Sequence, residues 1–415
     1  IADDGMRTRE RTWAAVSIGL QRDTEALPEM WELLGKKYKN DNIPAGILVG
    51  IGLMADDGKE LTPMMQEYRQ KLADAFLSRN LAGRKGVSER EQAFIGYALA
   101  KMGDPQSLDV MYRVLKRRRF GNIAKRSAAM ATGVLAPNLT DPSDKDKAVR
   151  KLKAFIGKTG DPTSINFATI SLSKIGTPEA IRLLLKYADK GSYGQRPFAA
   201  LGLGTHVWYR TKAGTMNEDE RKDIVVKLAK LEGKLNDPDS KAAFMLARGL
   251  VKDKTAIPEL VSIVISQGKD PVLRGFCCVT LGLIGDARQD VKDALKLALR
   301  ERRSEDLRRD AATGLGLLHD AEVVSVLLEE LDKAKSMTVQ GQIITALGKI
   351  GDHKAVRPLI EILKTKSKPT VTRAMCSVGL GLIGDLRPLP ELSRVAKDYN
   401  YRASVRDLDE LLYIL

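Results

Sequence analysis

The segment Thr280-Leu-Gly-Leu-Ile-Gly-Asp286 has three close copies further along the chain: Gly314-Leu-Gly-Leu-Leu-His-Asp320, Ala346-Leu-Gly-Lys-Ile-Gly-Asp352 and Gly379-Leu-Gly-Leu-Ile-Gly-Asp385. Their middle glycines are separated by 34, 32 and 33 residues. Self-similarity at a fixed period of about 20–50 residues is typical of repeat proteins. The chain is therefore predicted to be an array of repeats with a period near 33 residues.

The same register extends back to the N-terminus. We call the middle glycine of each copy, and the residues in register with it, the anchors. Every anchor is a glycine, an alanine or a serine: Gly19, Gly52, Ala100, Gly133, Ser173, Gly202, Gly249, Gly282, Gly316, Gly348 and Gly381. Eleven small residues in register predict about eleven repeats.

Each repeat is predicted to be a helical hairpin. Apolar residues such as Ile343, Leu347 and Ile350 fall at helical spacing around the anchor and define a first helix, helix A. Glycine inside a helix costs about 1 kcal/mol relative to alanine, so a recurring anchor glycine indicates close approach of a neighbouring helix. The following Gly351 is suited to end helix A in a left-handed cap, and Asp352 is a strong N-cap for a second helix, helix B. The expected fold is an all-α, right-handed α-solenoid of about eleven hairpins.

The Leu-Gly-Leu-Ile-Gly-Asp turn, followed by alanine or valine and then leucine, resembles HEAT repeats of the short bacterial type, also called phycobilisome-lyase HEAT-like repeats. The resemblance covers Arg7 to about Lys397. It implies an armadillo-like, continuous solenoid over residues 1–397, less regular in 1–239 and most regular in 240–397. Residues 398–415 are expected to form a capping or docking helix, because Leu408, Leu411 and Leu412 give it an apolar side.

Composition limits the function classes without choosing a partner. The 415 residues contain 68 Lys and Arg against 53 Asp and Glu, a net charge of +15 that favours anionic partners. No stretch approaches the roughly 18 consecutive apolar residues of a membrane span. The chain begins at Ile1, so we expect that an upstream leader has been removed and that the protein is bacterial and exported.

The residue types that usually carry catalysis are sparse. The three histidines, His206, His319 and His353, are scattered, and no His-Glu pair of the kind used by di-iron HEAT-like hydroxylases occurs. Cys277 and Cys376 occupy the same apolar slot of helix A and are expected in the core. The sequence therefore predicts no catalytic residue, no metal and no cofactor.

Three repeats carry extra residues, and these departures are the first candidates for function. The anchor gaps widen to 48, 40 and 47 residues, which places insertions at 55–62, 136–146 and 205–221. The last insertion mixes aromatic and basic residues of the sort enriched at binding hot spots, and we expect it to be exposed. Its candidate partner-binding residues are His206, Trp208, Tyr209 and Arg210. The alternative is a loop that only covers its own repeat.

Basic residues follow helix B in repeat after repeat. The richest stretch, Val110 to Thr140, contains no acid, and its candidate partner-binding residues are Arg117, Arg118, Arg119, Phe120, Lys125 and Arg126. A positive edge of this kind would suit an acidic loop or a phosphate group. The alternative is that these cations only complement the helix dipole.

Three functions are consistent with these patterns. The first is a non-catalytic scaffold that binds protein partners, with an acidic surface or a larger assembly as the target. The second is binding of a polyanion, either nucleic acid or an acidic polymer, along the basic edge. The third, a bilin lyase or isomerase, follows from the family resemblance alone.

Overall fold

The computed structural model describes residues 1–3, 5–55, 60–235 and 237–385. Helices dominate these residues, and the strands found there form a single hairpin of β1 (Asn80–Leu81) and β2 (Arg84–Lys85). The chain divides into two compact units, unit 1 (Ile1–Val251) and unit 2 (Lys252–Leu415). None of the described helices is both long and apolar enough to cross a membrane. The expected helix at 398–415 lies outside the described residues.

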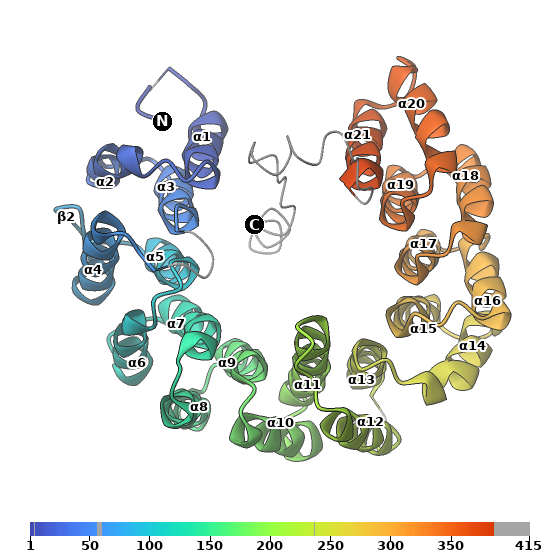
Figure 1. Ribbon diagram of the computed structural model, residues 1–415, viewed down its shortest axis with the longest axis horizontal. Coiled ribbons are helices and arrows are strands. Elements are labelled where there is room, and N and C mark those ends of the chain that lie inside the picture. The colour runs from blue at the N-terminus through green and yellow to red at the C-terminus, as the bar shows by residue number, and fades with distance from the viewer. Residues whose placement is uncertain (4, 56–59, 236, 386–415) are drawn as a thin grey trace. The chain divides into compact units, whose positions relative to one another are not determined.

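Within each unit the helices alternate between an inner layer of A helices and an outer layer of B helices (Figure 1). The A helices of unit 1 are α1 (Thr8–Leu20), α3 (Asn42–Leu53), α5 (Glu89–Lys101), α7 (Asn122–Leu135), α9 (Pro162–Ile175), α11 (Gln195–Lys212) and α13 (Pro238–Leu250). Its B helices are α2 (Leu27–Leu34), α4 (Pro63–Ser78), α6 (Leu108–Lys116), α8 (Pro142–Ile156), α10 (Pro178–Lys190) and α12 (Glu218–Glu232).

Unit 2 repeats the same order. Its A helices are α15 (Pro271–Ile284), α17 (Glu305–Leu318), α19 (Met337–Ile350) and α21 (Thr370–Asp385), and its B helices are α14 (Ile257–Ile265), α16 (Gln289–Leu299), α18 (Val324–Lys333) and α20 (Val356–Lys364). The described part of the chain thus contains eleven A helices, and all eleven anchors lie in them. The all-α solenoid of about eleven hairpins is confirmed.

The turn between helix A and helix B is largely as predicted. Gly103, Gly285 and Gly351 adopt positive φ after helix A, and His319 takes the same left-handed conformation. The aspartate that follows usually caps a 3-10 turn that leads into helix B. Asp104 and Asp352 each accept a hydrogen bond from the backbone N–H two residues later. Asp286 is an exception, because α16 starts only at Gln289.

Close helix packing explains why the anchors are small. A Cβ atom on Gly19 would lie 2.2 Å from the carbonyl oxygen of Gly50, and one on Gly282 would lie 2.6 Å from that of Gly314. Both anchors therefore face the residue two positions before the next anchor, as do Gly52, Gly133 and Gly316. In α11 this contact corrects the sequence register: Gly204 meets the next A helix at Ala247, whereas Gly202 faces the preceding one at Ser173. The structural anchor of α11 is Gly204.

A second repeated position was not recognised in the sequence. Eight residues before the anchor, arginine or glutamine donates a hydrogen bond to a carbonyl at the end of the preceding helix B. Examples are Arg274 Nε to Val264 O at 2.9 Å and Arg308 Nε to Leu299 O at 3.0 Å. Since the last carbonyls of a helix have no partner within it, this side chain satisfies them and fixes the connection to the next repeat.

The insertion expected at 205–221 is mostly not a loop. Helix α11 continues to Lys212, and α12 begins at Glu218, so only five residues connect them. The insertion expected at 136–146 is likewise short, because residues 136–138 form a 3-10 turn and α8 starts at Pro142. The extra length of these repeats is therefore taken up largely by longer helices.

Candidate binding surfaces

The first predicted group divides into surface and structural residues. Arg117, Arg118 and Arg119 follow the C-terminus of α6 and are exposed. Arg119 donates a hydrogen bond from Nη2 to Leu77 O at 2.8 Å, which holds the start of this loop against α4. Phe120 is buried, with its ring edge-on to Phe76 at 6.4 Å.

Lys125 and Arg126 lie at the start of α7 and are half-buried. Arg126 forms a bidentate pair with Asp161, with Nε to Oδ2 and Nη2 to Oδ1 both at 3.0 Å. The hydrogen bond from the Ser164 hydroxyl, followed by the Arg126 pair, lowers the pKa of the Asp161 carboxyl group. Arg126 thus links α7 to the N-cap of α9, and Phe120 fills the core, so both have structural roles.

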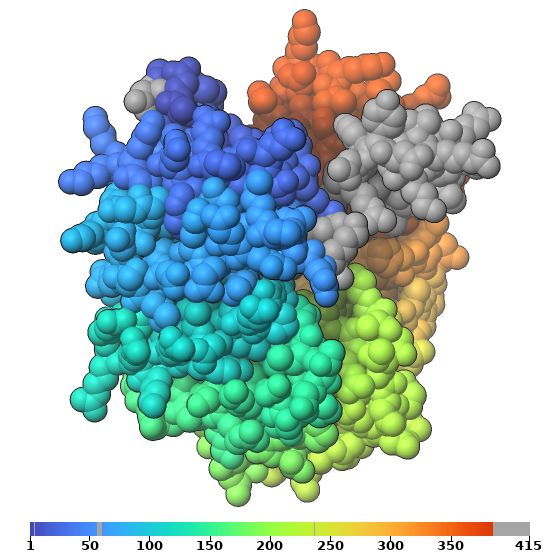
Figure 2. Space-filling view, turned by 60° about the vertical axis from the view of Figure 1, so that its left-hand side comes forward, coloured from blue at the N-terminus to red at the C-terminus, as the bar shows by residue number. Residues whose placement is uncertain are grey.

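Helix α8 adds cations that the sequence analysis missed, because it stopped at residue 140. Residues 108–158 contain 13 Lys and Arg against 4 Asp and Glu, a net +9 of the chain's +15. Lys151 lies over the Tyr112 ring at 6.0 Å, which brings α8 cations next to α6. We define the basic edge as the exposed residues Lys116, Arg117, Arg118, Arg119, Arg150, Lys151, Lys153 and Lys158. The blue-green surface of this region faces the viewer in Figure 2, and long side chains project from it.

Three cations at the corresponding positions of α16 and α18 in unit 2 form ion pairs. Arg300 lies 3.6 Å from Glu329, and Arg302 lies 3.0 Å from Glu330. Lys333 also pairs with Glu329. Basic residues therefore follow helix B in both units. The larger concentration of exposed cations is in unit 1, where Lys153 lies 3.5 Å from Glu179, and Lys364 and Lys366 of unit 2 are exposed as well.

The second predicted group lies on α11. His206 is buried, contrary to expectation, with Nδ1 3.4 Å from Ser173 O and Nε2 3.2 Å from Glu220 Oε1. Arg210 donates from Nη2 to Thr215 O at 2.8 Å and closes the turn after α11. His206 and Arg210 therefore hold the end of α11 in place. Trp208 and Tyr209 are exposed and pack edge to face at 5.0 Å.

The buried His206 predicts a stability that depends on pH. Burial lowers the pKa of its imidazole below the ordinary value, although Glu220 opposes this shift. Because the folded-state pKa is lowered, the folded protein favours the neutral imidazole. The contribution of His206 to the free energy of unfolding is therefore complete above about pH 6.5 and is lost as the pH falls through the folded-state pKa. We expect thermal melts to show less acid sensitivity in His206→Gln than in the parent chain. An NMR titration that placed the His206 pKa above 6.5 would contradict this.

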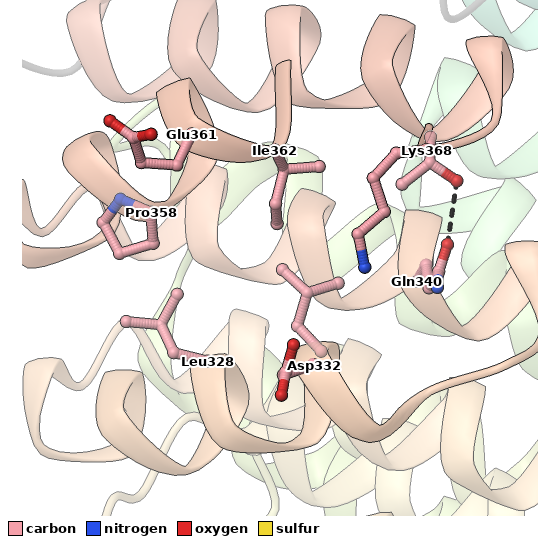
Figure 3. A pocket seen from close by; sticks show the side chains of 9 residues that line it. Leu328, Asp332, Gln340, Pro358, Glu361, Ile362 and Lys368 are labelled. Carbon is pink, nitrogen blue, oxygen red and sulfur yellow. Dashed lines mark hydrogen bonds between the residues drawn. The ribbon is translucent and has the colours of Figure 1, made fainter. Parts of the chain in front are cut away.

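A small pocket of about 250 Å³ lies between α18 and α20 in unit 2. Leu328, Pro358 and Ile362 form its apolar wall, and Lys368 points into it on the side of Asp332 (Figure 3). Gln340, at its base, accepts a hydrogen bond from the Thr372 hydroxyl at 2.8 Å. The side-chain oxygen of Gln340 thus already has a hydrogen-bond partner within the chain. The pocket volume is also below the range of about 300–1,000 Å³ that is usual for small-molecule sites.

The expectation that the cysteines belong to the core is confirmed. Cys277, Cys278 and Cys376 are free and buried. Burial raises the pKa of the Cys278 and Cys376 thiols, which disfavours the reactive thiolate. Among the described residues, no group of three or more His, Cys, Asp or Glu is placed to hold a metal ion.

The two layers of stacked hairpins, with their close-packed anchors, define an α-solenoid repeat protein. Residues 292–378 match the family model described as HEAT repeats. This part of the chain carries HEAT repeats, as its Gly-Asp turns indicated.

Relatives match only part of the chain. Protein YibA of Escherichia coli K12 is 29% identical over 124 residues, which cover 30% of this chain and 42% of YibA. Bilin biosynthesis protein PecE of Nostoc sp. PCC 7120 is 30% identical over 130 residues, which cover 29% of this chain and 47% of PecE. The matches thus span less than half the length of either relative.

Solved structures with some likeness include YibA of E. coli, with 15% identity and a TM-score of 0.34 over 79% of this chain and 99% of that one. Human deoxyhypusine hydroxylase has 15% identity and a TM-score of 0.30 over 83% of this chain and 98% of that one. Kap121p bound to Pho4p has 14% identity and a TM-score of 0.35 over 90% of this chain and 47% of that one.

Proposed function

We propose that the chain is a non-catalytic scaffold that binds an acidic surface of a partner protein through the basic edge of unit 1. One observation carries the proposal: the eight cations of the basic edge are exposed on neighbouring elements within a stretch of net charge +9, whereas Arg300 and Arg302 in unit 2 are paired with glutamates. Clustered charges of one sign attract an oppositely charged partner and accelerate its association. The bacterial and exported character expected from the sequence is part of the same proposal.

The physical contribution of the basic edge is collective. A single exposed ion pair stabilises by about 0–1 kcal/mol, so no one residue is expected to dominate. Arginine is the best-suited residue because its planar guanidinium binds carboxylates in bidentate fashion. Three consecutive arginines, Arg117, Arg118 and Arg119, therefore make this loop the most effective point for a test.

Replacing Arg117, Arg118 and Arg119 by alanine is expected to weaken partner binding about tenfold or more, because three exposed charge contacts are lost. The partner would be identified by cross-linking mass spectrometry in a lysate of the source cells, and its affinity measured by titration at low and high salt. The matched control replaces Lys364, Lys366 and Lys368, which follow α20 in unit 2. Equal affinity of the triple arginine variant, or equal loss in the control, would contradict the proposal.

Binding of a polyanion is the main alternative. Recognition of single-stranded nucleic acid generally uses exposed aromatic side chains for base stacking. In the basic edge the neighbouring Phe120 is buried and Tyr112 is half-buried, which favours a protein partner. Nuclease treatment before capture distinguishes the two, since loss of the captured material after nuclease would assign the edge to nucleic acid.

Similarity to PecE suggests a third possibility, because that relative is named for bilin biosynthesis. The match covers 29% of this chain, so a lyase or isomerase activity would have to be shown independently. A change in bilin absorbance on mixing with the full chain, dependent on protein concentration, would support that activity over the scaffold.

A further inference from the structure

One side of each A helix faces away from the B helices. It carries the residues that lie six and three positions before the structural anchor, together with those seven residues, or two helical turns, to either side of the latter. In α7, α9 and α11 these positions are filled mainly by large apolar side chains: Ile123, Met130, Phe167, Ile170, Phe198, Leu201 and Trp208. We call these seven residues the inner apolar face. Phe167 is 39% exposed, and Phe198 and Trp208 are each 37% exposed.

The three helices lie side by side, so the inner apolar face is continuous. A Cβ atom on Gly133 of α7 would lie 2.7 Å from the Ser171 Cβ of α9. Thr205 of α11 donates a hydrogen bond to the Ser173 hydroxyl of α9 at 3.2 Å. Figure 1 shows these helices as consecutive members of the inner layer of unit 1.

The charged residues of the three helices that carry this face are all basic, although Arg126 pairs with Asp161 and Arg210 lies 3.5 Å from Glu220. Helices α7, α9 and α11 contain no Asp or Glu, but they contain Lys125, Arg126, Lys174, Arg196, Arg210 and Lys212. Lys212 lies over the Trp208 ring at 5.3 Å, which puts a cation beside an exposed aromatic side chain. The inner layer of unit 2 differs, because α17 carries Glu305, Asp306 and Asp310.

We propose that the inner apolar face binds an amphipathic acidic helix of the partner protein. The inference rests on the proposed scaffold function and names the segment that the scaffold recognises. Exposed aromatic side chains supply the anchors of such helix-in-groove interfaces, and the surrounding cations complement an acidic rim. A second copy of this chain fits less well, since its net charge of +15 would be repelled. A planar anionic bilayer is also disfavoured, because the face lies on the inner side of the curve that unit 1 forms (Figure 1).

The test uses the full chain and a fluorescein-labelled peptide of about 18 residues, with leucine and phenylalanine on one helical side and glutamate elsewhere. Fluorescence anisotropy measures its affinity. The variant F167S/F198S is expected to weaken binding at least tenfold, since two aromatic anchors are lost. The matched control is Y193S/V226S, which changes two apolar residues of unit 1 that are 63% and 65% exposed but lie outside the face. Circular dichroism checks that both variants keep their helix content.

Two further binding measurements, with a lysine peptide and with lipid vesicles, show which kind of ligand the face prefers. A peptide with lysine in place of glutamate should bind at least tenfold more weakly, and phosphatidylserine vesicles should bind F167S/F198S and the parent chain equally. Equal binding of the acidic peptide by F167S/F198S and the parent, equal affinity for the lysine peptide, or vesicle binding lost only in F167S/F198S would each overturn the inference.

Failure of the inference about the inner apolar face can be distinguished from failure of the scaffold proposal. The variant R117A/R118A/R119A lies in the outer loop after α6 and should bind the peptide like the parent chain. If partner capture depends on these arginines but the peptide does not bind, the inference fails and the scaffold proposal stands. If the peptide binds through Phe167 and Phe198 while capture ignores the arginines, the basic edge has been assigned wrongly.

Discussion

Replacing Glu330 by alanine is expected to lower the free energy of unfolding of unit 2 by about 3–5 kcal/mol, the usual cost of removing one partner from a buried ion pair. The Glu330 side chain is 1% exposed and lies 3.3 Å from Arg308 Nη2 and 3.0 Å from Arg302 Nη2. The Arg308 side chain is only 7% exposed, so it cannot regain full hydration when Glu330 is lost. Chemical denaturation, followed by circular dichroism, measures the change.

The adjacent residue provides the control. Glu329 pairs with Arg300 and Lys333, but its side chain is 48% exposed. Exposed ion pairs contribute about 0–1 kcal/mol, so Glu329→Ala should have a small effect. Equal destabilisation by the two substitutions would contradict the role assigned to burial. Hydrogen exchange should place the loss caused by Glu330→Ala in α17 and α18.

The second large effect is expected at an inner-layer glycine. Alanine is normally the better helix former by about 1 kcal/mol, so Gly314→Ala in an uncrowded helix would stabilise the chain. Here the added Cβ would lie 2.4 Å from the Cys278 carbonyl oxygen of α15. Forcing these backbones apart should instead destabilise unit 2 by about 1–3 kcal/mol.

The sign of this change is the informative result. Thermal unfolding should show a lower melting temperature for Gly314→Ala than for the parent chain. The control Gly268→Ala should leave the melting temperature almost unchanged. At Gly268, in the turn before α15, no described atom lies within 4 Å of the Cβ position. A raised melting temperature for Gly314→Ala would show that the helices are not held by this contact.

The helical repeats were predictable because the residues that mark their helix ends and their packing are local in sequence and recur from repeat to repeat. Gly351 and Asp352, for example, mark the end of one helix and the start of the next within two residues, and the structure places both as expected. The anchors were found for the same reason, since close packing demands a small residue once in every repeat. Helix α11 contains two suitable glycines, and only the contact between Gly204 and Ala247 shows which is the anchor.

The surfaces were harder to predict because they depend on distant partners. Arg126 resembles Arg117 and Arg118 in sequence, but its pairing with Asp161, 35 residues away, gives it a structural role. The length of its repeat predicts that His206 lies in an inserted loop, whereas in the structure it lies in α11. The connection between α11 and α12 is marked by Gly214, which adopts φ +67°, and by Asn217, the N-cap of α12.

The inner apolar face was missed for a related reason. Phe167 and Phe198 belong to different repeats and look like core residues in a helical pattern. Only the packing of the layers shows that they lie on the side opposite the B helices.

We propose that unit 1 carries the partner-binding surfaces of this α-solenoid. Hydrogen exchange of the full chain, measured with and without the captured partner, tests it most directly. The account predicts slower exchange on binding in residues 108–158 and in α9 and α11. Protection confined to residues 252–385, with unit 1 unchanged, would contradict it.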